Sequence, residues 1–120
     1  MKKHVLIAED DTALADMMGK VLSKYNIRVT ITYNGKETVE ALEKEVPDLL
    51  LLDILMPVLD GHGVLKFIRE KSMECPVIVL SNLSDKKTRD KCKEMKAQNY
   101  FVKNDLDDDD LWPAIEEYLH

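Results

Sequence analysis

Short, continuous apolar runs alternate along this chain with longer segments in which apolar residues recur every three or four positions. The clearest runs are Val5-Leu6-Ile7-Ala8 and Leu49-Leu50-Leu51-Leu52. Such runs are typical of strands buried on both faces of a parallel sheet, and the periodic segments between them are typical of helices. The alternation therefore predicts an α/β fold, with strands near residues 4–9, 27–32, 48–53, 76–81 and 99–103.

Five helices are expected between and after these strands. The first begins at an N-cap formed by Asp11 or Thr12, and the last begins near Asp109 or Asp110. The second ends at Pro47, because proline cannot continue a helix. The residues expected to face the core from the first, second, third and last helices are Leu14, Met17, Met18, Val21, Leu22 and Tyr25; Val39, Leu42 and Val46; Val64, Phe67 and Ile68; and Leu111, Ile115 and Leu119.

The fourth helix, expected near residues 85–95, has a thin apolar stripe that comprises only Thr88, Cys92 and Met95 among many lysines and arginines. A helix that buries little belongs to the least stable part of a fold, where moving parts are found. Its basic surface is interpreted as a solvated face in preference to a dedicated docking surface. Both interpretations stay open from the sequence.

Length and charge limit the classes of protein to consider. The 120 residues predict a single domain, 1–120, and the net charge of −6 argues against direct nucleic-acid binding. No apolar run approaches membrane-spanning length, so we expect no membrane insertion and a cytoplasmic protein. Cys75 and Cys92 have neither disulfide nor metal spacing and are expected to be buried, whereas His4, His62 and His120 are expected to face solvent.

Acidic side chains follow two of the expected strands. Glu9-Asp10-Asp11 follows the first and Asp53 follows the third, while Ser81 and Lys103 end the fourth and fifth. A parallel sheet brings its strand-end residues to one crevice, where paired carboxylates repel by about 4 kcal/mol at 4 Å in an effective dielectric near 20. A hard cation relieves that repulsion, and Mg2+ prefers a few carboxylates plus water. This pattern predicts a Mg2+ site with an addressable aspartate.

Over essentially its whole length, the chain resembles the receiver domain of two-component response regulators. The resemblance rests on Glu9-Asp10, Asp53, the segment Met56-Pro57-Val58-Leu59-Asp60-Gly61, Ser81, and Lys103 with Tyr100 three residues before it. It implies a flavodoxin-like, doubly wound sheet of five parallel strands in the order 2-1-3-4-5, with five helices. It also implies a phosphorylation-activated signalling switch in place of a conventional turnover enzyme.

The resemblance assigns a role to each matching residue. Asp53 would accept the phosphoryl group, with Lys103 and Ser81 contacting the phosphate. Mg2+ would bind Asp10, Asp53 and the backbone carbonyl of Leu55 directly, and Glu9 through water. Ser81 and Tyr100 would switch conformation and thereby change the face formed by the fourth helix, fifth strand and fifth helix.

The resemblance also implies the partners. A histidine kinase or phosphotransfer protein would donate phosphate, and a downstream target or an output domain missing from this chain would receive the signal. The face around Tyr100 and Trp112 permits a phosphorylation-dependent homodimer.

Other interpretations of the acidic residues remain. Asp11 alone satisfies the need for a helix cap, and strand-end turn or surface positions are the structural alternatives for Asp53 and Lys103. A Mg2+-dependent phosphohydrolase usually has a second acid two residues beyond its nucleophile, where this chain has Leu55. A flavin carrier would need phosphate-binding donors where Glu9-Asp10-Asp11 would repel phosphate. A receiver-like interaction module that never turns over phosphate is the main alternative.

Three positions depart from the family pattern. Asn104 follows Lys103 where the family usually has a cis-bonded proline, and we expect a trans bond because a cis bond before asparagine costs about 3 kcal/mol. Lys96 replaces a glycine that commonly ends the fourth helix, so a positive φ there would carry strain. Asn82 replaces a very small residue after Ser81 and could crowd the phosphate.

Apolar residues occupy two positions that, in the family, flank the path of the water that hydrolyses the phosphoryl group. These are Leu55 and Leu83. Because an apolar rim neither positions nor activates water, we expect a comparatively long-lived phosphoryl group.

Overall fold

A five-stranded parallel sheet forms the centre of the computed structural model, which describes residues 2–82 and 86–119. The strands are β1 (Lys3–Ala8), β2 (Ile27–Thr32), β3 (Leu49–Leu52), β4 (Val77–Ser81) and β5 (Asn99–Val102). Their order is β2-β1-β3-β4-β5, and every neighbouring pair is parallel. The predicted flavodoxin-like topology is confirmed, and each predicted strand boundary lies within one residue of the observed one.

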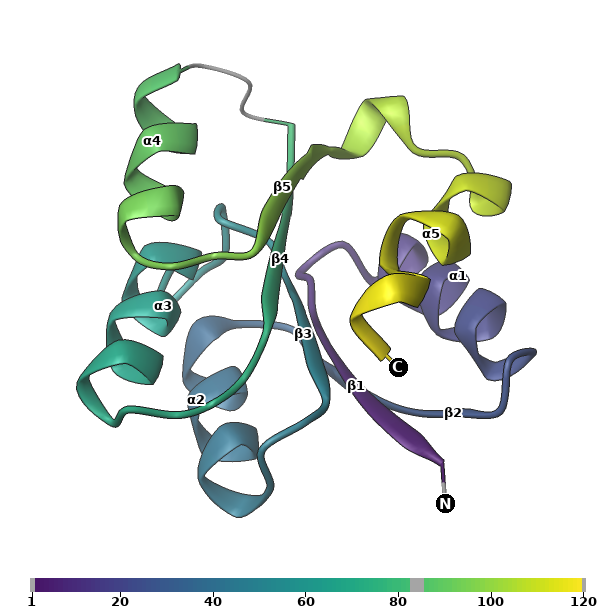
Figure 1. Cartoon of the computed structure of the whole chain (residues 1–120), viewed down its shortest axis with the longest axis horizontal. Coiled ribbons are helices and arrows are strands. Elements are labelled where there is room, and N and C mark those ends of the chain that lie inside the picture. Colours follow the sequence, from purple (N-terminus) through teal and green to yellow (C-terminus); the bar gives the residue numbers. More distant parts are fainter. Residues whose placement is uncertain (1, 83–85, 120) are drawn as a thin grey trace.

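Helices cover both faces of the sheet. Figure 1 shows α1 (Thr12–Ser23) and α5 (Asp108–Ile115) on one side, and α2 (Gly35–Lys44), α3 (Gly61–Glu70) and α4 (Lys86–Glu94) on the other. Two short 3-10 helices, η1 (Lys103–Asp105) and η2 (Glu116–Leu119), precede and follow α5. Within the described residues, no helix has the length and apolarity needed to cross a bilayer.

Side-chain oxygens accept backbone hydrogen bonds in the first turns of α1 and α5. Asp11 accepts a hydrogen bond from the Leu14 amide at 3.1 Å, so Asp11 is the N-cap of α1 that the sequence left open between two residues. The side chain of Asp110 accepts a hydrogen bond from the Asp107 amide at 2.9 Å. This hydrogen bond makes Asp107 the N-cap of α5, whose first residue is Asp108. The helix therefore begins one residue before the predicted start at Asp109 or Asp110.

The two faces of the sheet carry separate hydrophobic clusters because successive strand residues point to opposite sides. Leu50 and Leu52 pack toward α2, α3 and α4, whereas Leu49 and Leu51 pack toward α1 and α5. All four leucines of β3 are therefore buried. Both faces being covered explains why this strand has a continuous apolar run in place of an alternating one.

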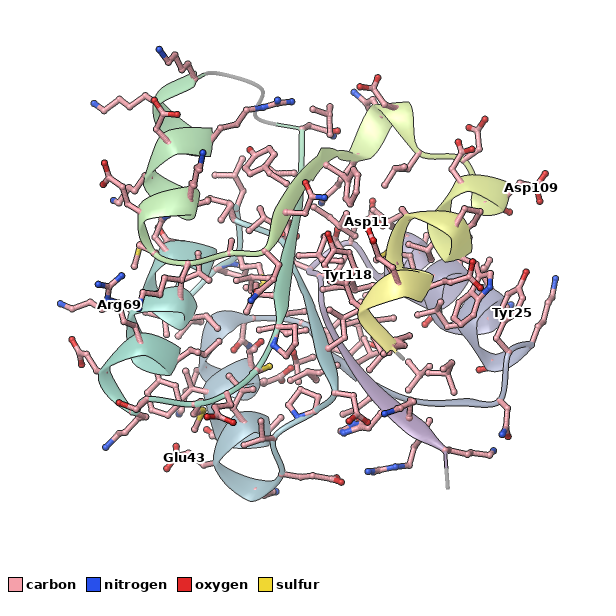
Figure 2. The ribbon with its side chains drawn as sticks, in the orientation of Figure 1. Asp11, Tyr25, Glu43, Arg69, Asp109 and Tyr118 are labelled. Carbon is pink, nitrogen blue, oxygen red and sulfur yellow. The ribbon has the colours of Figure 1, made fainter. Side chains whose placement is uncertain are left out.

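Two predicted core residues lie outside the core. Tyr25 and Val46 are exposed, because α1 ends at Ser23 and α2 ends at Lys44, before either residue is reached. Figure 2 shows Tyr25 beside α5, and its ring stacks on Trp112 with the ring centroids 4.2 Å apart. The apolar periodicity of the sequence thus continues past the ends of both helices.

The prediction that the histidines face solvent is wrong for two of them. His4 is only 7% exposed, and its Nε2 lies 2.8 Å from the Thr30 hydroxyl on the neighbouring strand. Burial lowers the pKa of His4, and the nearby Arg28 acts in the same direction. His62 is half-buried on α3, and burial lowers its pKa too. His120 lies outside the described residues.

Helix α4 buries a single side chain, Cys92, which confirms the predicted thin stripe. Thr88 and Met95 are only half-buried. The segment after the helix turns through Lys96 at a φ of 67°, so lysine does occupy a left-handed position that favours glycine. Arg69 of α3 donates a hydrogen bond to the Glu94 carbonyl at 2.8 Å and thereby satisfies one acceptor at the end of the helix.

The start of α3 is pressed against the backbone that carries Asp53. A Cβ atom added to Gly61 would lie 2.5 Å from the Asp53 carbonyl oxygen and 2.7 Å from the Ile54 Cα. We therefore expect Gly61→Ala to lower the free energy of unfolding by about 1–3 kcal/mol, because the backbone must shift. Urea denaturation followed by circular dichroism measures this.

Gly19→Ala is the matched control. Its added Cβ would meet two side-chain atoms and no backbone, the Ile31 Cδ1 at 3.3 Å and the Val29 Cγ1 at 3.7 Å, and alanine favours the helix interior by up to about 1 kcal/mol. We expect this variant to be as stable as the wild type or slightly more stable. A Gly61→Ala protein as stable as Gly19→Ala would contradict the proposed close packing.

Candidate functional site

The two buried acidic residues lie one position beyond the ends of neighbouring strands. The Glu9 amide donates to the Thr32 carbonyl and the Asp53 amide donates to the Ala8 carbonyl, both at 3.0 Å. These bonds continue the pairing of β2, β1 and β3 past the ends of the strands. The sheet backbone therefore holds Glu9 and Asp53 side by side.

Three carboxylates meet at this edge of the sheet, as the sequence predicted. Glu9, Asp10 and Asp53 each present an oxygen within 4.8 Å of the others. Glu9 is 1% exposed and Asp53 is 4% exposed, whereas Asp10 is open to solvent. Asp11 does not belong to this group, because its side chain caps α1.

Lys103 bridges the two buried carboxylates from the far side of β4. It is the first residue after β5, and its Nζ lies 3.1 Å from Asp53 Oδ2 and also contacts Glu9 Oε1. Because β4 separates β5 from β3, only a long side chain can make this contact. One ammonium group is thus shared between two carboxylates.

Burial changes the proton affinities of these groups. It raises the pKa of Glu9 to about 7, against the hydrogen bond from Lys103, and Asp53 adds to the rise. Burial also raises the pKa of Asp53, although Lys103 opposes that change. The pKa of Lys103 is raised, because its contacts with Glu9 and Asp53 outweigh the effect of burial. The carboxyl shifts thus reflect chiefly the removal of these acids from water, which Lys103 offsets only in part.

The other predicted site residues lie around this group. Ser81 is the last residue of β4 and is fully buried, and Tyr100 is half-buried in β5 under the Arg89 guanidinium, 5.3 Å from the ring centroid. The Leu55 amide donates to Asp53 Oδ1 at 3.3 Å, while the Leu55 side chain is 60% exposed. Leu83 lies outside the described residues.

The donor set fits a magnesium ion. Three carboxylates each present an oxygen within 4.8 Å of the others, and hard oxygen ligands are those that Mg2+ prefers. Two of these carboxylates are buried against one ammonium, so the group holds a surplus of negative charge that a cation would neutralise. The exposed Asp10 leaves the group open to solvent on one side.

Two features of the site were not predicted in this form from the sequence. Val58 has a φ of 70° and is 78% exposed, although a β-branched residue rarely adopts a left-handed backbone. The side-chain Oδ1 of Asn82 accepts a hydrogen bond from the Asn104 amide at 3.0 Å. Both residues depart from the family pattern, but nothing in the sequence predicts a hydrogen bond between them.

The trans peptide bond predicted before Asn104 is confirmed.

Many known proteins are similar to this chain. The family model for the response regulator receiver domain matches residues 5–116, so the chain belongs to the receiver domains of two-component signalling. A probable transcriptional regulator, ycf27 of Guillardia theta, is 36% identical over 102 residues, which are 85% of this chain and 40% of that protein. Transcription factor SKN7 of Saccharomyces cerevisiae is 37% identical over 78 residues, which are 65% of this chain and 12% of that protein.

Solved structures agree with this assignment. The receiver domain of the Francisella response regulator 1452 has a TM-score of 0.90 at 26% identity and covers 98% of this chain and 97% of its own. The BeF3-activated receiver domain of Klebsiella pneumoniae RstA has a TM-score of 0.89 at 25% identity, with coverage of 98% and 99%. The chain thus covers nearly all of these two solved receiver domains but less than half the length of the curated relatives described above.

The raised pKa of Glu9 predicts a pH-dependent stability. A carboxyl group whose folded pKa is about 7 contributes its full stability below the pKa of the unfolded chain, and that contribution is lost as the pH rises through about 7. We expect the free energy of unfolding of the metal-free protein to fall between about pH 5 and pH 8, by an amount on the order of 1 kcal/mol. Urea denaturation at a series of pH values measures this.

Glu9→Gln should remove part of that fall, since an amide does not ionise. Glu43→Gln is the control, because Glu43 is exposed on α2, as Figure 2 shows, and should leave the pH profile unchanged. Mg2+ should offset the loss at high pH, because a divalent cation favours the ionised carboxylates. A profile that is the same in wild type and Glu9→Gln would contradict the assigned pKa.

Proposed function

We propose that this domain, residues 1–120, is a phosphorylation-activated switch whose phosphoacceptor is Asp53. The observation that carries the proposal is a buried Asp53 carboxylate held between an acidic group and the Lys103 ammonium. Membership of the receiver family supports a signalling role over a conventional enzyme. The phosphoryl group would come from a histidine kinase or a phosphotransfer protein.

In the proposed reaction, an Asp53 oxygen attacks the phosphorus of a phosphohistidine. The new O–P bond forms as the P–N bond breaks, and the leaving imidazole takes the electron pair. Asp10, Asp53 and the Leu55 carbonyl would hold Mg2+ directly, with Glu9 bound through water. When bound, Mg2+ would neutralise charge on the carboxylates and on the phosphoryl oxygens.

Lys103 and Ser81 are proposed to contact the phosphoryl group after transfer. The ammonium of Lys103 already lies 3.1 Å from Asp53, so it can follow the new negative charge without a large movement. Ser81 ends the strand next to β3 and offers a hydroxyl donor. A phosphohydrolase is less well supported, because position 55, two residues after Asp53, is a leucine and provides no carboxyl group for acid catalysis.

Incubation with acetyl phosphate and Mg2+ tests the phosphoacceptor. We expect the intact mass of the wild type to rise by one phosphoryl group, and Asp53→Asn and Asp53→Ala to show no gain, because each lacks the nucleophilic oxygen. Omitting Mg2+ should slow the reaction strongly. Asp16→Asn is the control, since Asp16 is an exposed residue of α1 and should be labelled like the wild type.

The same experiment measures the lifetime of the phosphoryl group after the donor is removed. The exposed apolar side chain of Leu55 near Asp53 supports a slow loss, because it cannot orient water. Loss within seconds would count against this. Equal labelling of wild type and Asp53→Asn would instead favour a module that does not use Asp53.

The signal is proposed to leave through the face formed by α4, β5 and α5. Helix α4 buries only Cys92, so its position can change at little energetic cost. Tyr100 of β5 lies under Arg89 of α4, so a rotation of the tyrosine ring would change a contact between the two elements. Movement of the Ser81 hydroxyl toward a phosphate would shift the equilibrium between the two orientations of the Tyr100 ring.

Nuclear magnetic resonance can follow this propagation. We expect beryllofluoride with Mg2+ to shift the amide resonances of residues 86–102, because charge added at Asp53 alters the position of α4 and β5. The amides of α2 serve as the internal control and should change less. Unchanged resonances in residues 86–102 would show that the signal does not travel this way.

The output is proposed to lie beyond this chain. The similar proteins from Guillardia theta and yeast are described as a probable transcriptional regulator and a transcription factor, and each is much longer than the matched segment. A downstream target protein, or an output domain joined to the receiver domain, would therefore read the altered face. A phosphorylation-dependent homodimer through the surface around Tyr100 and Trp112 is a further proposal consistent with that role.

A further inference from the structure

The contact between Asn82 and Asn104 joins two segments that carry residues of the proposed mechanism. Asn82 directly follows Ser81, and Asn104 directly follows Lys103. The last register pair of β4 and β5 is Ser81 with Val102, so the contact forms where the backbone ladder between these strands stops. The Asn82 side chain supplies an acceptor there, and the Asn104 amide donates to it at 3.0 Å.

This hydrogen bond acts on the peptide unit that follows Lys103. The Asn104 amide and the Lys103 carbonyl belong to the same planar unit. The Asn104 amide donates to Asn82, and the Lys103 carbonyl accepts from the Leu106 amide at 3.1 Å. Both ends of the unit are therefore held, which restricts the backbone from which the Lys103 side chain extends toward Glu9 and Asp53.

The contact needs a side-chain acceptor at position 82 and a residue other than proline at position 104, and two of the three departures from the family pattern meet these conditions. Proline at position 104 would have no amide hydrogen to donate. A very small residue at position 82 would have no side-chain acceptor. The two substitutions are thus the two partners of one interaction.

We propose that Asn82 is a positioning residue for Lys103, acting through the Asn104 amide. This inference rests on the proposed function, because the orientation of Lys103 affects phosphorylation only if Asp53 is the phosphoacceptor. The hydrogen bond holds the ammonium of Lys103 at the place where the phosphoryl charge develops. Such preorganisation favours transfer, since the charge need not be brought into place during the reaction.

Asn82→Ala tests the proposal in the acetyl phosphate reaction. We expect the phosphorylation rate constant at saturating Mg2+ to fall by about three- to tenfold, the range for loss of one ordinary hydrogen bond. The affinity for Mg2+ by titration calorimetry should not change, because Asn82 touches none of the carboxylates. If Asn82 instead obstructs the site, the same variant will react faster than the wild type, and the proposal fails.

Substitutions of Asn104 separate the backbone donor from the side chain. Asn104→Ala keeps the amide hydrogen and should retain the contact, whereas Asn104→Pro removes it and should slow the reaction. In the Asn104→Pro background, Asn82→Ala should cause no further loss, because the partner is already absent. A further loss of similar size in that background would show that Asn82 acts by another route.

The metal-free protein shows whether the contact exists independently of phosphorylation. We expect slow hydrogen exchange of the Asn104 amide in the wild type and faster exchange in Asn82→Ala, with broadening of the Lys103 ammonium resonance. If the wild type is not phosphorylated but these changes occur, the proposed function fails and the positioning of Lys103 stands. If the Asn104 amide is unprotected or the Lys103 resonance is unaffected, the proposal is overturned.

Discussion

Two carboxylates buried against a single ammonium are the feature on which the rest of this structure depends. Glu9 and Asp53 are almost completely excluded from water, yet among the residues that the structure describes only Lys103 forms an ion pair with them. An excess of buried negative charge is unfavourable unless something offsets it. The backbone pairing of β1 with β2 and β3 keeps the two residues together despite this cost. The acidic group therefore fits the cation proposed for it, since a cation would offset this charge.

The architecture separates the well-buried part of the molecule from a helix that buries little. The central strands are covered on both faces, and their leucines and isoleucines form two clusters that hold the acidic residues in place. Within the described residues, helix α4 buries only the side chain of Cys92, and Arg69 of α3 donates a hydrogen bond to its Glu94 carbonyl. The proposed switch would use this difference, because a helix that buries little can be repositioned without unfolding the core.

Backbone conformations that favour glycine occur in the loop after β3 and in the turn after α4. Val58 lies between β3 and α3, and Lys96 lies two residues after the end of α4, and both have a positive φ. Such positions cost on the order of 1 kcal/mol each for residues with a side chain. The close contact of Gly61 with the Asp53 carbonyl places a further constraint on the same loop. At Val58 and Lys96, the packing of the surrounding structure thus outweighs the intrinsic preference of these residues for a negative φ.

The chain order of apolar runs and strand-end side chains was sufficient to predict the sheet and the acidic group. A run such as Leu49–Leu52 indicates a strand covered on both faces, and parallel strands bring Glu9, Asp10 and Asp53 to one edge whatever the details of the loops. Only the tertiary structure decided the individual side-chain contacts that the order of the strands does not determine. Burial of His4 depends on its fit against Thr30, and the pairing of Asn82 with Asn104 depends on where β4 and β5 end. Periodicity describes which side of an element a residue faces, whereas such contacts arise from the packing of one element against another.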